Sequence, residues 1–143
     1  MTKSINVVLY TRVANAEQEK IKSELQEQEI ILRNYCDTKG YKVQEVIREI
    51  SSGTETMRPE LNVLYTYVFD NRDNIGKVLL TTWDRTSRDV EQTIDVIKKF
   101  QKIGVEVQTV NQAKDMSNRE HQFALWVYLT HDMMLQFKIN NNK

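Results

Sequence analysis

Short apolar runs alternate with longer amphipathic segments along most of this chain. The apolar runs predict strands over residues 5–10, 41–50, 77–82 and 105–110. The segments between them place apolar residues at helical spacing and predict helices over residues 17–39, 58–68 and 89–102. Gly40 and Gly104 follow the first and third of these helices, where glycine commonly ends a helix. The alternation predicts an α/β fold with a mostly parallel sheet of four to five strands, flanked by helices.

The last part of the chain predicts a helix with an unusually broad apolar surface. Residues 111–118 are polar and predict a connection, and the helix begins near Arg119. Apolar side chains then cover more than one of its faces. They are Phe123, Leu125, Trp126, Val127, Tyr128, Leu129, Met133, Met134, Leu135 and Phe137. Such a helix either packs closely on its own sheet or is shared with a second subunit. Because the chain stops soon after Phe137, we expect a fragment of a longer protein.

Composition narrows the class of protein. The length of 143 residues and a hydrophobic content of 40% predict one globular domain. Twenty basic residues balance twenty acidic ones, so a domain that holds nucleic acid by itself is disfavoured, and most of any DNA affinity should come from another domain or from assembly. The single cysteine, Cys36, excludes an internal disulfide and is expected to be a buried thiol. With no secretory signal or membrane-length apolar run, we expect a cytoplasmic protein without membrane contact.

Four arginines stand near the ends of predicted strands or loops and are the first candidates for chemistry. They are Arg12, Arg58, Arg85 and Arg88. Ligands of open α/β sheets bind at the carboxyl ends of the strands, and the guanidinium fork suits phosphate. Each arginine taken alone has an ordinary explanation as a surface or ion-paired residue. A group of four at one sheet edge predicts an anion site, because clustered cations repel one another until an anion neutralises them.

Polar neighbours of these arginines have both structural and chemical interpretations. Asp84 either exchanges a proton with a leaving oxygen or orients an arginine. Asp89 favours a helix start, and Ser87 is by default a helix cap. Gln18 and Gln28 fall on or near the first helix, where a solvated face explains most glutamines.

Taken in order, these residues resemble the catalytic domain of the serine recombinases, the resolvase and invertase family. The matching segments are Tyr10-Thr11-Arg12-Val13, the pair Gln18 and Gln28 followed by Leu32 and Tyr35, Ser52-Gly53 leading to Arg58-Pro59-Glu60-Leu61, the signature Asp84-Arg85-Thr86-Ser87-Arg88-Asp89, and Gly104-Val105. The resemblance covers about residues 5–117. It implies a three-layer catalytic domain over residues 1–118 and the start of a long dimerisation helix over 119–143, with the DNA-recognition domain absent.

The resemblance also implies a reaction. The family cuts and rejoins DNA through a serine–phosphate link, without a metal or another cofactor. The four arginines would contact the scissile phosphate and stabilise charge on its oxygens. Asp84 would assist proton transfer, while Tyr10, Gln18, Gln28 and Ser87 would support the site. The implied partners are DNA and further copies of the chain, as a homodimer that becomes a tetramer when two DNA sites are brought together.

One departure from the family pattern bears directly on mechanism. The attacking serine of the family follows the Arg-Val pair, and here that position is Ala14, whose methyl group cannot attack phosphorus. Asn15 also replaces the common threonine. Whether Ala14 is natural or introduced stays open, although an engineered knockout would normally change the nucleophile alone. Conceivable substitute nucleophiles are Ser23, Ser51 and Ser87.

Three functions therefore compete. The first is a recombinase catalytic domain that Ala14 has silenced. The second is a recombinase-derived module that dimerises or occupies DNA sites without cutting. The third disregards the resemblance: the chain would be a flavodoxin-like or receiver-like domain that binds a small anion. This last reading lacks a glycine-rich phosphate loop and the clustered acids of a receiver.

Overall fold

The computed structural model describes residues 5–14, 17–50, 59–82, 85 and 90–110. Strands and helices alternate within these residues, as the sequence predicts. The elements are β1 (Asn6–Val13), α1 (Gln18–Lys39), β2 (Lys42–Ile50), α2 (Pro59–Asp70), β3 (Lys77–Leu80), α3 (Val90–Gln101) and β4 (Glu106–Thr109). The predicted helix from Arg119 and the domain boundary at residues 118 and 119 lie outside the described residues.

The four strands form one parallel sheet in the order β2-β1-β3-β4. The connection from β1 leads to β2 on one side, and the later strands are added on the other side. The strand order therefore reverses between β1 and β3. In open α/β sheets the crevice at this reversal, beyond the carboxyl ends of the strands, is where ligands bind. This position in the fold is the first structural indication of a site.

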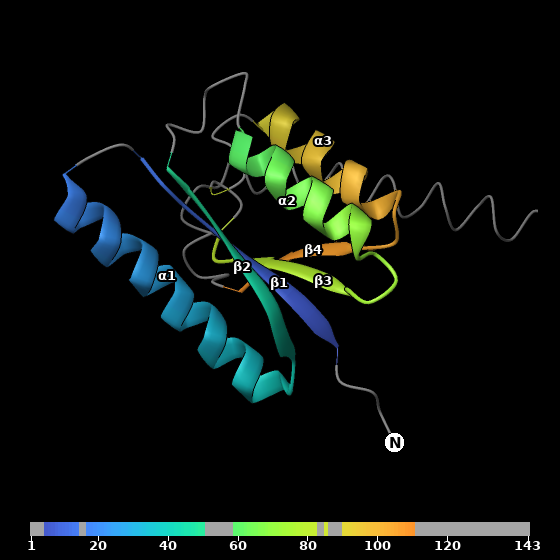
Figure 1. Cartoon of the computed structure of the whole chain (residues 1–143), viewed down its shortest axis with the longest axis horizontal. Coiled ribbons are helices and arrows are strands. Elements are labelled where there is room, and N and C mark those ends of the chain that lie inside the picture. The colour runs from blue at the N-terminus through green and yellow to red at the C-terminus, as the bar shows by residue number, and fades with distance from the viewer. Residues whose placement is uncertain (1–4, 15–16, 51–58, 83–84, 86–89, 111–143) are drawn as a thin grey trace, which may run out of the picture.

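Two apolar cores hold helices on opposite faces of the sheet. Figure 1 shows α1 on one side of the strands and α2 with α3 on the other, which gives three layers. The α1 core consists of Val7, Leu9, Leu32, Cys36 and Leu79. The larger core under α2 and α3 consists of Val8, Tyr10, Leu64, Val68, Ile75, Val78, Leu80, Ile97, Phe100, Val105 and Val107. Successive residues of β1 thus contribute to opposite cores, as a strand buried on both faces requires.

The first strand is longer than the sequence pattern predicts. The apolar run indicates an end at Tyr10, whereas β1 continues to Val13. Its last three residues, Thr11 to Val13, pair with Arg48 to Ile50 of β2. Pairing with β2 therefore extends β1 through Thr11 and Arg12, whose polar side chains interrupt the apolar pattern of a strand. As a result Arg12 lies at the carboxyl end of the sheet.

A one-residue bulge interrupts β2. Val7 of β1 pairs with Val43, but the next residue, Val8, pairs with Glu45, so Gln44 is the extra residue. A bulge reverses which face of the sheet each later side chain meets. Before it, Val43 packs in the α1 core. After it, Ile47 packs against the α2–α3 core, while Val46 packs in the α1 core.

The first helix ends as predicted at a left-handed glycine. Gly40 has φ 73°, and its N–H donates to the carbonyl of Cys36. Such a cap turns the chain sharply into β2. Within the described residues, no helix combines the length and the apolar character that crossing a membrane requires.

Candidate functional site

Arg12 and Ala14 occupy the end of the central strand, next to the reversal between β1 and β3. Arg12 is the penultimate residue of β1 and is only 2% exposed. Ala14 follows the strand and is exposed. The paired residues of β1 and β3 are Val7 to Leu9 with Lys77 to Leu79. The end of β1 is therefore hydrogen-bonded to β2 on one side, while its other side meets groups that are not part of a strand.

Arg85, from the segment after β3, is hydrogen-bonded directly to Arg12. The Nε of Arg12 donates to the carbonyl of Arg85 over 2.8 Å, and Nη1 of Arg85 donates to the carbonyl of Arg12 over 3.2 Å. The backbone N–H of Arg85 in turn donates to the carbonyl of Thr82 over 3.1 Å. Two arginines 73 residues apart are thus held together by each other's backbone oxygens. Each guanidinium thus donates to a carbonyl oxygen, and its attraction to that carbonyl dipole offsets part of the repulsion between the two like charges.

The side chain of Gln28 binds both backbone groups of Arg12. Its Oε1 accepts from the N–H of Arg12 over 3.1 Å, and its Nε2 donates to the carbonyl of Arg12 over 2.9 Å. The carboxamide thereby acts as a peptide group would in a neighbouring strand. Gln28 lies on α1 and is 4% exposed. The explanation of Gln28 as part of a solvated helix face is therefore wrong, because its carboxamide fixes the end of β1.

A buried acid, Glu49, also lies at this end of the sheet, and sequence reasoning missed it. Tyr10 donates its phenolic hydrogen to the Glu49 carboxylate, and both side chains are fully buried. Tyr10 and Arg12 are two residues apart on β1 and share one face, and Glu49 is the register partner of Arg12 on β2. The signal for Glu49 in the sequence is weak, because the bulge at Gln44 breaks the alternation that would assign it to a face.

The structure describes some of the predicted site residues and not others. It brings together Arg12, Arg85 and Gln28, with Tyr10 on the same strand as Arg12. Gln18 is the exposed first residue of α1, and Ser23, a substitute nucleophile by sequence, is exposed on the same helix. The remaining predicted residues lie outside the described residues: Arg58, Asp84, Ser87 and Arg88, together with Ser51.

Comparison with known proteins identifies the family to which this chain belongs. Residues 7–137 match the family described as the resolvase N-terminal domain. The match spans most of the chain, so the chain belongs to the resolvase family of serine recombinases. No match to a curated protein sequence was found.

Several solved structures have the same fold. The C-terminal catalytic domain of ISC1926 TnpA, an IS607-like serine recombinase, is 34% identical with a TM-score of 0.65, over 74% of this chain and 67% of that chain. The N-terminal catalytic domain of TP901-1 integrase is 23% identical with a TM-score of 0.66, over 92% of this chain and 96% of that chain. A resolvase family site-specific recombinase from Streptococcus pneumoniae is 17% identical with a TM-score of 0.67, over 96% of this chain and 93% of that chain. These likenesses confirm the predicted fold and family.

Proposed function

We propose that this chain is the catalytic domain of a site-specific DNA recombinase and that, as it stands, it binds the DNA backbone without cutting it. The observation that carries the proposal is the direct contact of Arg12 with Arg85 at the reversal between β1 and β3, two residues before Ala14. A phosphodiester is the anion that the family chemistry requires at this place. The homodimer, its tetramer on paired DNA sites, and further DNA contacts outside this domain belong to the same proposal.

The two described arginines differ in what they offer a phosphate. Arg85 is less buried than Arg12, although the Nε of its guanidinium is buried, so Arg85 is the arginine that a ligand approaching from solvent reaches more easily. Arg12 is nearly buried and bonded to Arg85. A phosphate contact by Arg12 therefore requires the surrounding residues to shift when DNA binds. In this arrangement Arg85 contacts the phosphate first, and Arg12 holds the carbonyl of Arg85 in place.

Ala14 determines whether the site can cut DNA or can only bind its phosphate. The exposed Ala14 occupies the place where the family carries its attacking hydroxyl, and its side chain holds no oxygen. Charge stabilisation by arginine lowers the barrier to phosphoryl transfer only when a nucleophile is present. Binding without cleavage is thus the activity that the described residues support.

The alternative is a recombinase-derived module that associates with DNA and dimerises, and that has no catalytic role. Ala14 favours this alternative too, because a module that never cuts has no need of a serine. The two proposals differ in whether the rest of the site is still competent.

Restoring the serine tests the proposal. The chain and its Ala14→Ser variant are each fused to a DNA-binding domain of known sequence preference and incubated with duplex DNA that carries paired sites. Covalent protein–DNA linkage is measured on denaturing gels. We expect linkage from the Ala14→Ser protein and none from the unaltered chain. Ala14→Val serves as the matched control, because it changes side-chain size without adding an oxygen.

Two results would change the conclusion. Linkage by the unaltered chain would refute the silenced site and would direct attention to another serine. Equal DNA binding by both proteins, with linkage by neither, would favour the non-catalytic module.

A further inference from the structure

We propose that the ion pair between Glu29 and Arg48 is a positioning device that holds the Gln28 carboxamide on the backbone of Arg12. This inference rests on the proposed function, since it matters for DNA chemistry only if Arg12 serves the phosphate site. It assigns a role to two residues that carry no recombinase motif in the sequence.

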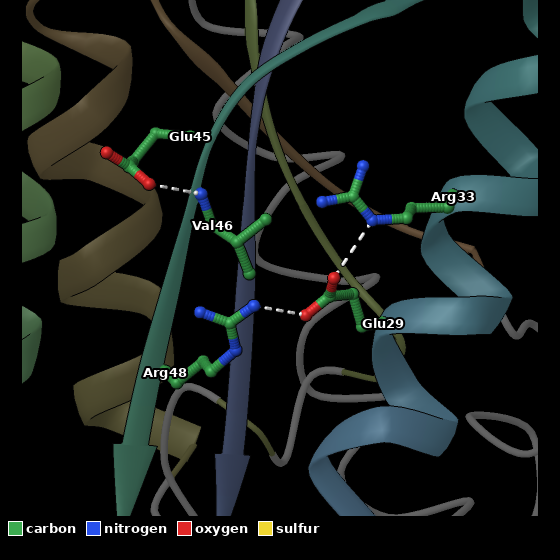
Figure 2. Close-up of polar contacts among 5 residues, drawn as sticks. All are labelled: Glu29, Arg33, Glu45, Val46 and Arg48. Carbon is green, nitrogen blue, oxygen red and sulfur yellow. Dashed lines mark hydrogen bonds and ion pairs between the residues drawn. The ribbon is translucent and has the colours of Figure 1, made fainter.

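The ion pair joins a helix and a strand that both contact β1. The Oε1 of Glu29, on α1, lies 2.6 Å from Nη2 of Arg48, on β2. Figure 2 shows the Glu29 carboxylate between Arg48 from the strand and Arg33 from its own helix. Arg48 is the register partner of Thr11, the residue before Arg12. The pair therefore fixes α1 relative to the sheet beside the end of β1.

Because Gln28 and Glu29 are neighbours on α1, the contact of Gln28 with Arg12 depends on the contact of Glu29 with Arg48. Gln28 turns inward to Arg12, while Glu29 reaches across to β2. Both hydrogen bonds of the carboxamide depend on where this turn of α1 lies, because donor and acceptor must meet the N–H and the carbonyl of one residue together. A sliding or tilting of α1 breaks both bonds. The Glu29–Arg48 pair opposes that movement from the next residue along the helix.

Arg33 provides an internal comparison. Its Nε lies 2.9 Å from Oε2 of Glu29, but the two residues are four apart on α1. This second pair stabilises the helix and makes no connection to the sheet. Loss of Arg33 and loss of Arg48 each remove one partner of the same carboxylate. Only the loss of Arg48 removes an ion pair between α1 and β2, which leaves the apolar α1 core as the contact between them.

The size of the effect is limited by water. The side chains of Arg48 and Glu29 are 52% and 20% exposed, and they line a groove of about 460 Å³ that also contains Lys22 and Ile30. Exposed pairs of this kind contribute little to global stability. A local opening is a smaller event than unfolding, and a weak contact can change its frequency by roughly two- to fivefold.

Amide hydrogen exchange, measured by NMR on the chain itself, tests the inference without DNA. The reporter is the backbone N–H of Arg12, which Gln28 accepts. The reference is the N–H of the buried Val105, which donates to the carbonyl of Phe100 over 3.0 Å. We expect Arg48→Met and Glu29→Gln to speed exchange at Arg12 by roughly two- to fivefold and to speed exchange at Val105 by a smaller factor. Arg33→Met should change neither, and Arg48→Lys should restore most of the protection.

The inference is wrong if Arg48→Met leaves Arg12 exchange unchanged, if Arg33→Met accelerates it equally, or if Arg12 and Val105 accelerate by the same factor. The proposed function fails separately, through the absence of covalent linkage in the Ala14→Ser protein. The two results are therefore distinguishable.

Discussion

The phenol of Tyr10 on β1 donates a hydrogen bond to the carboxylate of Glu49 on β2, and solvent reaches neither side chain. A buried carboxylate is costly unless it is hydrogen-bonded, so this contact helps to retain an acid inside the sheet. It lies on the same face of β1 as Arg12. The relationship joins the α2–α3 core, to which Tyr10 belongs, to the candidate site.

Removal of the Tyr10 hydroxyl should therefore destabilise the fold. Tyr10→Phe keeps the ring in the α2–α3 core but leaves the Glu49 carboxylate with one donor fewer. We expect a loss of about 1–3 kcal/mol in the free energy of unfolding, measured with urea. A double-mutant cycle with Glu49→Gln should give a coupling above about 0.5 kcal/mol. Additive effects would show that the hydrogen bond contributes nothing of its own.

Gln28→Glu is nearly isosteric and separates the two bonds of the carboxamide. A carboxylate can still accept from the Arg12 N–H, but it cannot donate to the Arg12 carbonyl. We expect a destabilisation of about 1–3 kcal/mol at neutral pH, because two oxygens then face each other in a buried place. Gln18→Glu, on the exposed first turn of α1, should change stability by less than about 0.5 kcal/mol. Similar effects of the two variants would contradict a structural role for Gln28.

Arg85→Met tests the charge of the site in the Ala14→Ser protein. The substitution keeps much of the side-chain volume and removes the guanidinium of Arg85, the less buried of the two described arginines at the reversal between β1 and β3. We expect covalent DNA linkage to slow by about 10²-fold or more, as when a preorganised donor to a reacting oxygen is lost. Arg72→Met is the control, since Arg72 stacks on Phe69 at 4.3 Å near the end of α2. Linkage that survives Arg85→Met would exclude Arg85 from the reaction.

The free energy of unfolding should depend on pH through the ionisation of Glu29, which lies beside Arg33 and Arg48. Partial burial raises the pKa of Glu29, but hydrogen bonds and charge from Arg33 and Arg48 outweigh it and hold the pKa below the ordinary value of 4.5. A lowered pKa means that the native state prefers the ionised form. This contribution is present above 4.5 and is lost as the pH falls through the lowered value.

The matched comparison is the Glu29→Gln variant, whose side chain does not titrate. Its neighbouring cations Arg33, Arg48 and Lys22 are unchanged. Urea titrations should show the unaltered chain more stable by at most about 1 kcal/mol at neutral pH, with the difference fading in acid. A difference that persists unchanged in acid would mean that the carboxylate charge is not its source.

The sequence predicts the order and type of the elements well, because each strand and helix carries its own apolar periodicity. It also predicts that Arg12 and Arg85 belong to one region, from their places after separate strands. It does not predict how they meet, because each arginine uses the backbone oxygen of the other. Gln28 is named by its resemblance to family glutamines, yet its burial depends on the extension of β1 to Val13. Glu49 is missed because local alternation cannot reveal a register shift.

The extra residue at Gln44 determines where two later charges of β2 lie. Upstream of it, odd-numbered side chains such as Val43 meet the α1 layer; downstream, even-numbered ones such as Arg48 do. If the same residues ran as a regular strand without the bulge, Glu49 would face α1 and Arg48 would face the Tyr10 side, whereas deletion of Gln44 would leave both residues in their present register. Insertions and deletions in this strand are thus not interchangeable with those in loops. A homologue without the bulge would keep its buried acid opposite the same residue of β1, and an alignment that places the one-residue gap further along β2 would compare side chains from opposite faces.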